Sequence, residues 1–195
     1  MQRVSVVGIS GAGKSTLAAR LAERMGAPHI ELDSIRHQPG WTELPDEAFR
    51  REVEERTRAE RWVVDGNYPM VRDIIWSRAD TVVWLDLPRH VVMRRIVLRT
   101  LRRVLFRVQL WNGNRERWVN LTSIDPERSV VAWAWWKHGE SRALYQRLMR
   151  QSESPRIVRL ADDAAVESFT ASIYSQDSPG LSLCARDRGG WVRQK

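Results

Sequence analysis

Several features that would assign a protein to a class at once are scarce or missing in this sequence. One cysteine, Cys184, excludes an intramolecular disulfide framework and favours a reducing, cytoplasmic environment. No apolar run approaches the length that spans a bilayer, so we expect no membrane partner, and the chain enters its first apolar segment too early for a signal peptide. The four histidines lack metal-ligand spacing, and no Asn-Lys-x-Asp guanine motif occurs. Disulfide-rich, membrane-spanning, zinc-binding and GTPase classes are therefore not expected.

Positive charge is what the chain has in excess. Its 195 residues suit one domain with an apolar core, and a net charge of +8 favours anionic partners, either nucleotides or nucleic acid. Arginine forks bind phosphate oxygens in pairs. We expect three or four arginines of one segment to contact a ligand and the rest to form a solvated helix face. Every cationic position between residues 89 and 117 is arginine: Arg89, Arg94, Arg95, Arg99, Arg102, Arg103, Arg107, Arg115 and Arg117.

Residues 8–15 form the most specific motif, an uninterrupted G-x-x-x-x-G-K-[ST] loop. Its glycines allow a tight backbone path that directs several N–H groups at one phosphate. Lys14 is expected to reach the β- and γ-phosphates, and the Ser15 hydroxyl to coordinate Mg²⁺. An apolar strand pattern precedes the loop, and a helix pattern follows it, with its positive end toward the phosphates. We predict that Mg-ATP is bound by Gly8, Ser10, Gly11, Ala12, Gly13, Lys14, Ser15 and Thr16.

Strand-like and helix-like segments alternate along the chain, which predicts a parallel sheet with helices on both faces. Strands are predicted at residues 3–7, 29–32, 61–64, 81–85 and 156–160, and helices at 15–25, 46–60, 71–78, 89–107, 131–151 and 162–174. We assign residues 1–175 to this domain. Residues 176–195 are rich in Ser, Pro, Gly and Arg, which predicts a mobile tail.

Three aspartates follow predicted strands, where ligands of parallel sheets bind. Asp33 comes after the second strand, Asp65 after the third, and Asp86 ends the fourth. Asp65 or Asp86 could supply the carboxylate near the metal, and Asp86 could instead cap the next helix. If the acceptor is a hydroxyl, Asp33 is a candidate general base, whereas an acceptor phosphate would need none.

Four segments of the chain resemble small P-loop kinases related to adenylate kinase, in particular the topology-modulation proteins. They are the phosphate loop, Asp33-Ser34-Ile35-Arg36, Trp62-Val63-Val64-Asp65-Gly66, and Leu87-Pro88 with Arg95-Ile96-Val97-Leu98-Arg99. The subgroup resemblance rests on Asp65-Gly66-Asn67-Tyr68, on Leu110-Trp111-Asn112-Gly113-Asn114-Arg115-Glu116 and on the tryptophan-rich segment 133–138.

The resemblance implies a P-loop fold with five strands in the order 2-3-1-4-5, an acceptor-binding insertion at about residues 33–60 and an arginine-rich lid at about 100–126. It favours Asp65 over Asp86 as the acidic residue near Mg²⁺. Asn67-Tyr68-Pro69 replaces the Phe-Pro-Arg of adenylate kinases, and the lid lacks their four-cysteine pattern. Adenosine monophosphate is therefore not the expected acceptor.

The predicted activity is transfer of the γ-phosphate of Mg-ATP to a small polar acceptor, such as a nucleotide, nucleoside or similar metabolite. Arg95 and Arg99, four residues apart on one helix face, would clamp the transferring group. The acceptor would be bound by Asp33, Arg36, Arg72 and Arg142. The alternative is a nucleotide-dependent nucleic-acid-binding protein, which we favour less because the sequence shows no aromatic stacking platform. We expect a monomer.

Ten tryptophans are present, and the default expectation for them is burial. Trp41, next to Gly40, could instead offer a platform for a ring. Strand or helix spacing predicts core packing for Trp76, Trp84, Trp118, Trp133 and Trp136.

Overall fold

The computed structural model describes residues 1–151 and 154–176, so the predicted tail lies outside the described residues beyond residue 176. Its centre is a five-stranded parallel sheet in the order β2-β3-β1-β4-β5. This confirms the predicted fold and strand order. The strands are β1 (Arg3–Gly8), β2 (His29–Glu31), β3 (Trp62–Asp65), β4 (Thr81–Leu85) and β5 (Arg156–Leu160).

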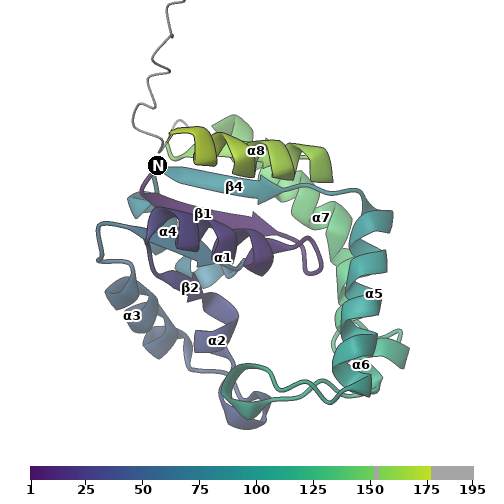
Figure 1. Cartoon of the computed structure of the whole chain (residues 1–195). Coiled ribbons are helices and arrows are strands. Elements are labelled where there is room, and N and C mark those ends of the chain that lie inside the picture. Colours follow the sequence, from purple (N-terminus) through teal and green to yellow (C-terminus); the bar gives the residue numbers. More distant parts are fainter. Residues whose placement is uncertain (152–153, 177–195) are drawn as a thin grey trace, which may run out of the picture.

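Helices connect successive strands and cover the sheet (Figure 1). Most predicted helices are present, and the one predicted at residues 46–60 is shorter because it ends in a turn after Arg56. Gly26 ends α1 in a left-handed conformation (φ 57°) that suits glycine. The helices are α1 (Lys14–Met25), α2 (Leu32–Arg36), α3 (Asp46–Arg56), α4 (Pro69–Arg78), α5 (Arg89–Leu105), α6 (Val119–Thr122), α7 (Val130–Gln151) and α8 (Asp163–Gln176), with short 3₁₀ turns η1 (Pro39–Trp41) and η2 (Trp111–Gly113).

Alternation along β1 divides the core between the two faces of the sheet. Val4 and Val6 pack with apolar residues of α1, whereas Val7 faces Trp84 and Tyr145 on the other side. A third cluster joins β2 and β3 to the helices α2, α3 and α4. The strands thus read as continuous apolar runs because both faces are covered, as in other parallel sheets.

The tryptophan predictions divide. Trp84 is buried in the sheet, and Trp76 packs at the edge of the core. The prediction of core positions was wrong for Trp118, Trp133 and Trp136, whose exposed fractions are 53%, 37% and 64%. Trp133 and Trp136 lie in the first half of α7, and Trp118 directly precedes α6. Helical spacing gives the face of a side chain but not whether another element covers that face.

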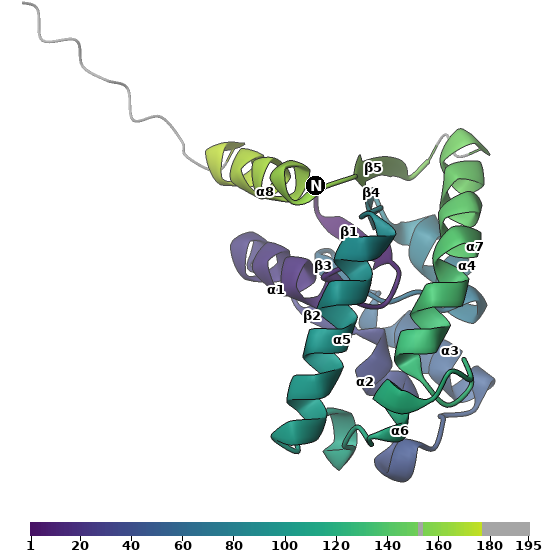
Figure 2. The ribbon, with the colours of Figure 1, turned by 90° about the vertical axis from the view of Figure 1, so that its right-hand side faces the viewer.

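Helices α5 and α7 run side by side past the sheet and carry α6 at their far end (Figure 2). From there the chain between α5 and α6 crosses to the segment that follows α2, where η2 contacts α2 and η1 (Figure 1). No helix in the described part of the chain combines the length and apolar character that crossing a membrane requires.

Candidate active site at the phosphate loop

A cavity of about 590 Å³ lies at the carboxyl end of β1 and is lined by residues 10–17 of the phosphate loop and α1. The loop follows the predicted path. Gly8 has φ 148°, and a Cβ there would lie 2.8 Å from the carbonyl oxygen of Leu85, so only glycine fits. Gly13, with φ 98°, directs the N-terminus of α1 into the cavity. The predicted nucleotide-binding residues thus surround one cavity, apart from Gly8, which shapes the loop.

Lys14 and Ser15 face acidic side chains. Burial lowers the pKa of Lys14, while the carboxylates of Asp33 and Asp65 act in the opposite direction. The Lys14 ammonium donates to the carbonyl oxygen of Ile9 at 3.3 Å, within the loop itself. The Ser15 hydroxyl donates to Asp65 Oδ2 at 2.5 Å. The structure thus brings together the predicted phosphate-binding amine, the predicted metal ligand and the carboxylate expected behind it.

Asp65 is fixed from its other side by His29. The Oδ1 atom of Asp65 lies 3.0 Å from His29 Nε2, and Asp65 is buried. The hydrogen bond to Asp65 raises the pKa of His29, which favours the imidazolium form. Sequence reasoning missed His29, although it opens the strand that pairs with Asp65's own strand.

Asn67 holds the entrance to the phosphate loop. Its side-chain amide accepts a hydrogen bond from the N–H of Gly8 at 3.2 Å and donates one to the Gly8 carbonyl at 2.6 Å, so it pairs with Gly8 as a neighbouring strand would. The Tyr145 hydroxyl donates to Asn67 Oδ1 at 3.0 Å, and burial raises the pKa of Tyr145 to about 12. The Asn67 that departs from the adenylate kinase pattern therefore has a structural task at the site.

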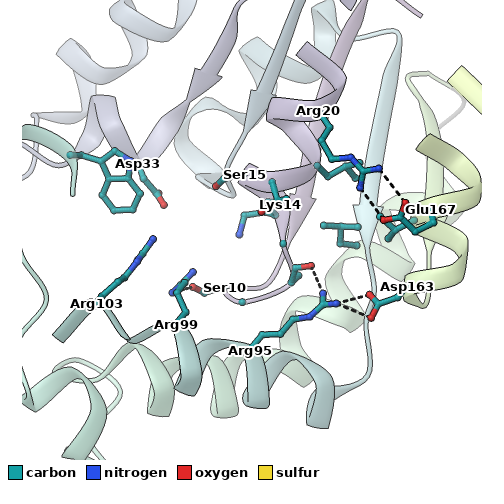
Figure 3. Close-up of a pocket in the computed structure, with 18 residues that line it drawn as sticks. Ser10, Lys14, Ser15, Arg20, Asp33, Arg95, Arg99, Arg103, Asp163 and Glu167 are labelled. Atoms are coloured by element: carbon teal, nitrogen blue, oxygen red, sulfur yellow. Dashed lines mark hydrogen bonds and ion pairs between the residues drawn. The ribbon is translucent and has the colours of Figure 1, made fainter. Parts of the chain in front are cut away.

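Three arginines of α5 project into the cavity at intervals of four residues: Arg95, Arg99 and Arg103 (Figure 3). Arg99 Nη2 donates to Ser10 Oγ at 3.2 Å, and burial lowers the pKa of Arg99. Arg103 pairs with Glu116 of the lid at 2.8 Å. One helix face thus supplies a row of cations above the loop, and three of the nine arginines in the segment line the cavity.

The far end of the cavity is closed by α8. Arg95 pairs with Asp163 at 2.7 Å and donates to the Ala12 carbonyl, and Arg20 of α1 pairs with Glu167 at 2.9 Å (Figure 3). Both acids come from the first turns of α8. The cavity therefore extends from the phosphate loop to α8 on one side and to Asp33 on the other.

Asp33 lines the opposite end of the cavity (Figure 3). Its Oδ1 accepts a hydrogen bond from the Tyr68 hydroxyl at 2.7 Å, and His37 Nε2 lies 3.3 Å from the same hydroxyl. Burial, followed by the neighbouring charge of Asp33, raises the pKa of Tyr68, so Tyr68 remains a donor. The geometry holds the Asp33 carboxylate in place while leaving it at the cavity surface, as a general base requires.

The other predicted acceptor residues lie elsewhere. Arg36 is buried, forms ion pairs with Glu43 at 2.5 Å and Asp46 at 2.7 Å, and donates a hydrogen bond to the Leu44 carbonyl. Arg72 stacks over the Trp76 ring, and Arg142 pairs at 3.2 Å with Asp86. Asp86 also accepts from Arg159 of β5, so it belongs to an ion-pair cluster and not to the loop's cavity.

Glu31 and Trp111 were not predicted as site residues. Both lie at the Asp33 end of the cavity, named the acceptor end because Asp33 was predicted to bind the acceptor. Glu31 pairs in register with Asp65, and burial raises its pKa, opposed by a hydrogen bond from the Trp111 side chain. Trp111 lines the cavity together with Asp33 and Arg103. The Glu31-x-Asp33 spacing at a strand end was a usable signal for Glu31. Trp111 stands in a segment that the subgroup resemblance singled out, but no local pattern pairs it with its partners, which lie about 75 residues away.

The site fits Mg²⁺ held mainly by a nucleotide. Within the described residues, no group of three or more His, Cys, Asp or Glu side chains could hold a metal ion alone. Ser15 and Asp65 nevertheless place a hydroxyl and a carboxylate side by side at the phosphate loop. Mg²⁺ commonly takes few protein ligands and completes its shell with phosphate oxygens and water.

Comparisons with known proteins agree with this arrangement. A family model described as an AAA domain matches residues 4–85, which include the phosphate loop, Asp33 and Asp65. YqaC of Bacillus subtilis (strain 168), described as uncharacterized, is 26% identical over 172 residues, covering 85% of this chain and 91% of its own length. A shikimate kinase from Synechococcus elongatus is 28% identical over 134 residues, covering 58% of this chain and 70% of its own.

Two solved shikimate kinases share the fold. The enzyme from Acinetobacter baumannii in complex with shikimate aligns with a TM-score of 0.53 at 18% identity, over 92% of this chain and 96% of its own. The enzyme from Bacteroides thetaiotaomicron aligns with a TM-score of 0.50 at 19% identity, over 90% and 97%. At these identities the solved structures establish the fold, which extends over nearly the whole chain.

Proposed function

We propose that this chain is a small P-loop kinase that transfers the γ-phosphate of Mg-ATP to a hydroxyl group of a small polar acceptor. The observation that carries the proposal is the position of Asp33, which lines the same cavity as Lys14, Ser15 and the phosphate loop. In the reaction, the acceptor oxygen bonds to the γ-phosphorus while the bond from that phosphorus to the bridging oxygen breaks. Asp33 accepts the hydroxyl proton, and ADP leaves.

The phosphate-binding residues divide the work by position. Lys14 and the loop N–H groups bind the β- and γ-phosphates, and Arg99 stabilises charge on the transferring group. Arg95, beside α8, contacts the nucleoside side of ATP. Ser15, with Asp65 behind it, would hold Mg²⁺, which when bound neutralises phosphate charge. A closer relation to adenylate kinases and topology-modulation proteins stays a prediction.

The charges at the acceptor end favour a hydroxylated acceptor without a phosphate group of its own. Asp33 lines this end and Glu31 hydrogen-bonds with the Trp111 side chain beside it, whereas Arg36, Arg72 and Arg142 lie outside the cavity. An anionic acceptor would have to share the arginines of α5 with the nucleotide. A nucleoside or sugar-like polyol needs only hydrogen-bonding groups and a base. The relatives named shikimate kinases make shikimate a required member of any test panel.

The test is phosphate transfer from γ-labelled ATP to a panel of nucleosides, nucleotides, sugars and shikimate. We expect labelling of a hydroxylated compound, and Asp33→Asn should slow it by about 10²- to 10⁴-fold, as expected for loss of a general base. Asp73→Asn is the matched control, because Asp73 is exposed on α4 and pairs with Arg50. Labelling of no compound, or full activity in the Asp33→Asn variant, would refute the proposal.

A second candidate is binding of single-stranded nucleic acid, and exposed aromatic side chains favour it. Trp133, Trp135 and Trp136 of α7 and Trp118, just before α6, are exposed. Both helices contact α5, and Arg89 of α5 stacks over the Trp135 ring. Aromatic side chains stack on unpaired bases, and arginines contact the phosphates between them. These exposed aromatic side chains, which the sequence did not predict, are what supports this candidate.

Fluorescence anisotropy of a labelled single-stranded oligonucleotide tests this candidate. Binding should weaken steeply with salt, and the double variant Trp133→Ala/Trp136→Ala should weaken it by roughly tenfold or more, since each stacked base contributes about 1–3 kcal/mol. Lys14→Ala is the control that keeps this surface intact. Absence of binding at low salt would refute this candidate, and kinase activity would be the one function still proposed.

A further inference from the structure

Two tight turns meet beside the acceptor end of the cavity. One follows α2 and is closed by an antiparallel bridge between His37 and Glu43. The other belongs to the lid and is closed by a bridge between Gln109 and Arg115. Their tips are η1 and η2, which contact each other where the chain after α5 meets the segment after α2 (Figure 1).

Two asparagines of the lid turn bind the backbone of the opposite turn. Asn112 Nδ2 donates to the carbonyl oxygens of Ser34 at 3.1 Å and His37 at 2.6 Å. Asn114 Nδ2 donates to the Gln38 carbonyl at 2.9 Å, and its Oδ1 accepts from the backbone N–H of Trp41 at 2.9 Å.

Asn114 uses both ends of its amide group and is 4% exposed, so its surroundings match its hydrogen-bonding capacity. Asn112 has φ 53°, a left-handed conformation that asparagine tolerates better than most residues. The residue types thus suit both the contacts and the backbone.

An aromatic cluster lies beside these hydrogen bonds of Asn112 and Asn114 and extends to the acceptor end. The Trp111 ring stacks with His37 at 5.9 Å between centroids, and Trp41 lies edge-on to Trp111 at 6.4 Å. The Trp111 side chain also hydrogen-bonds to Glu31. Because Trp111 directly precedes Asn112, the hydrogen bonds of Asn112 fix the position of the Trp111 indole relative to Asp33.

We propose that Asn112 and Asn114 are positioning residues that latch the lid onto the turn after α2, and that Trp111 is the specificity-determining residue that closes the acceptor end. The role in acceptor selection rests on the proposed kinase function, whereas the contacts between the two turns do not depend on it. The contacts between the turns are mainly hydrogen bonds from side chains to backbone groups, which water can replace when the lid opens. The latch can therefore form and release in each catalytic cycle. With the lid latched, an acceptor must fit between Asp33 and Trp111, which limits its size.

Amide hydrogen exchange, followed residue by residue by NMR on the full chain, tests the latch without any acceptor. The N–H of Trp41 is bonded to the lid, whereas the N–H of Gln38 is bonded within its own turn, to the Thr42 carbonyl at 2.8 Å. In Asn114→Ala, exchange at Trp41 should accelerate by roughly two- to tenfold, the effect of losing one hydrogen bond, while exchange at Gln38 stays unchanged. Gln109→Ala, an exposed position in the same lid turn, should change neither.

The functional half uses the acceptor that the labelling panel identifies. Asn114→Ala and Trp111→Ala should each raise the KM for that acceptor by about tenfold with little change in the KM for ATP, and Trp111→Phe should restore part of the loss. Trp111→Ala should also phosphorylate acceptors larger than the wild-type protein accepts. Unchanged exchange at Trp41 in Asn114→Ala would overturn the latch even if the kinase proposal stands. Altered exchange with an unchanged acceptor KM and acceptor range would overturn its role in specificity. If the panel labels nothing, the kinase proposal fails and the latch is decided by exchange alone.

Discussion

At the scale of single residues, Lys14 is the side chain on which phosphate transfer should depend most. It lies at the start of α1, and its partly buried ammonium faces the cavity near Asp33 and Asp65. Lys14→Ala should reduce phosphate transfer by at least about 10²- to 10³-fold, because a fixed charge at the transferring group is lost. Thermal unfolding without nucleotide should change little, because Lys14 is only partly buried and its hydrogen bond to the Ile9 carbonyl is long, at 3.3 Å. Retained transfer by a folded variant would refute the assignment.

A second prediction at this scale concerns His29. Its hydrogen bond to Asp65 raises its pKa above the usual value of about 6.5. The protonated pair therefore adds stability that is complete below the unfolded-state pKa and is lost as the pH rises through the folded-state pKa. NMR titration of the His29 ring should show the raised pKa, and Asp65→Asn should lower it. A pKa that does not respond to this substitution would mean that the pair does not form.

At the scale of elements, the five-residue helix α2 explains why Asp33 and Arg36 serve different purposes. Asp33 faces the cavity, whereas Arg36, three residues later, pairs with one acid before α3 and one at its start and stacks over the Phe49 ring. Their closeness in sequence suggested one acceptor-binding pair. The partners of Arg36 lie beyond a turn whose path the local sequence does not determine.

Arg36→Ala should therefore act on stability first. We expect the free energy of unfolding to fall by about 1–3 kcal/mol, since a buried charged group with several partners is removed. Denaturant unfolding with an unchanged m-value measures this loss. Arg51→Ala, an exposed change on the neighbouring α3, should stay within about 0.5 kcal/mol of the wild type. An unchanged stability combined with a raised acceptor KM would restore the sequence-based assignment.

The row of arginines on α5 should separate by position along the helix. Arg99→Ala should lower kcat by about 10³-fold or more, in the range seen for arginines that contact the transition state. Arg95→Ala should mainly raise the KM for ATP, because Arg95 lies beside Ala12 and Asp163 at the far end of the cavity. Arg94→Ala is the control on the exposed face of the same helix. Steady-state kinetics of all three variants tests these position-specific effects. A diffuse charge effect would instead change kcat and the KM for ATP similarly in all three.

At the scale of the whole molecule, the sequence predicted what local patterns and a shared motif can carry. Apolar runs identified the parallel strands, and the phosphate loop identified the nucleotide end of the cavity. The acceptor end depends on pairs such as Trp41 with Asn114, which lie 73 residues apart. Hydrophobic periodicity does not predict such a pair, because the sequence of each turn is typical of an ordinary polar loop. The exposed tryptophans were mispredicted for a related reason: helical spacing gives the face of a side chain but not whether another element covers that face.

Charge is also distributed unevenly over the whole molecule. Residues 89–150 contain fourteen Lys and Arg against four Asp and Glu, whereas the rest of the chain contains eighteen and twenty. The arm formed by α5, the lid and α7 therefore carries the positive charge, and it borders the nucleotide cavity. Such a field should attract Mg-ATP over distances that salt screens at about 10 Å for 0.1 M ionic strength.

We expect kcat/KM for ATP to fall by several-fold between 50 and 500 mM salt, while kcat changes much less. The double charge reversal Arg94→Glu/Arg102→Glu should lower kcat/KM at low salt and flatten its salt dependence, because both side chains are exposed and neither lines the cavity. Replacing the same residues by lysine keeps the charge and should leave both quantities near their wild-type values. Stopped-flow binding of a fluorescent ATP analogue would place the effect in the association rate. A salt effect confined to dissociation would instead assign it to direct contacts made by Lys14 and Arg99, and long-range attraction by the arm would be refuted.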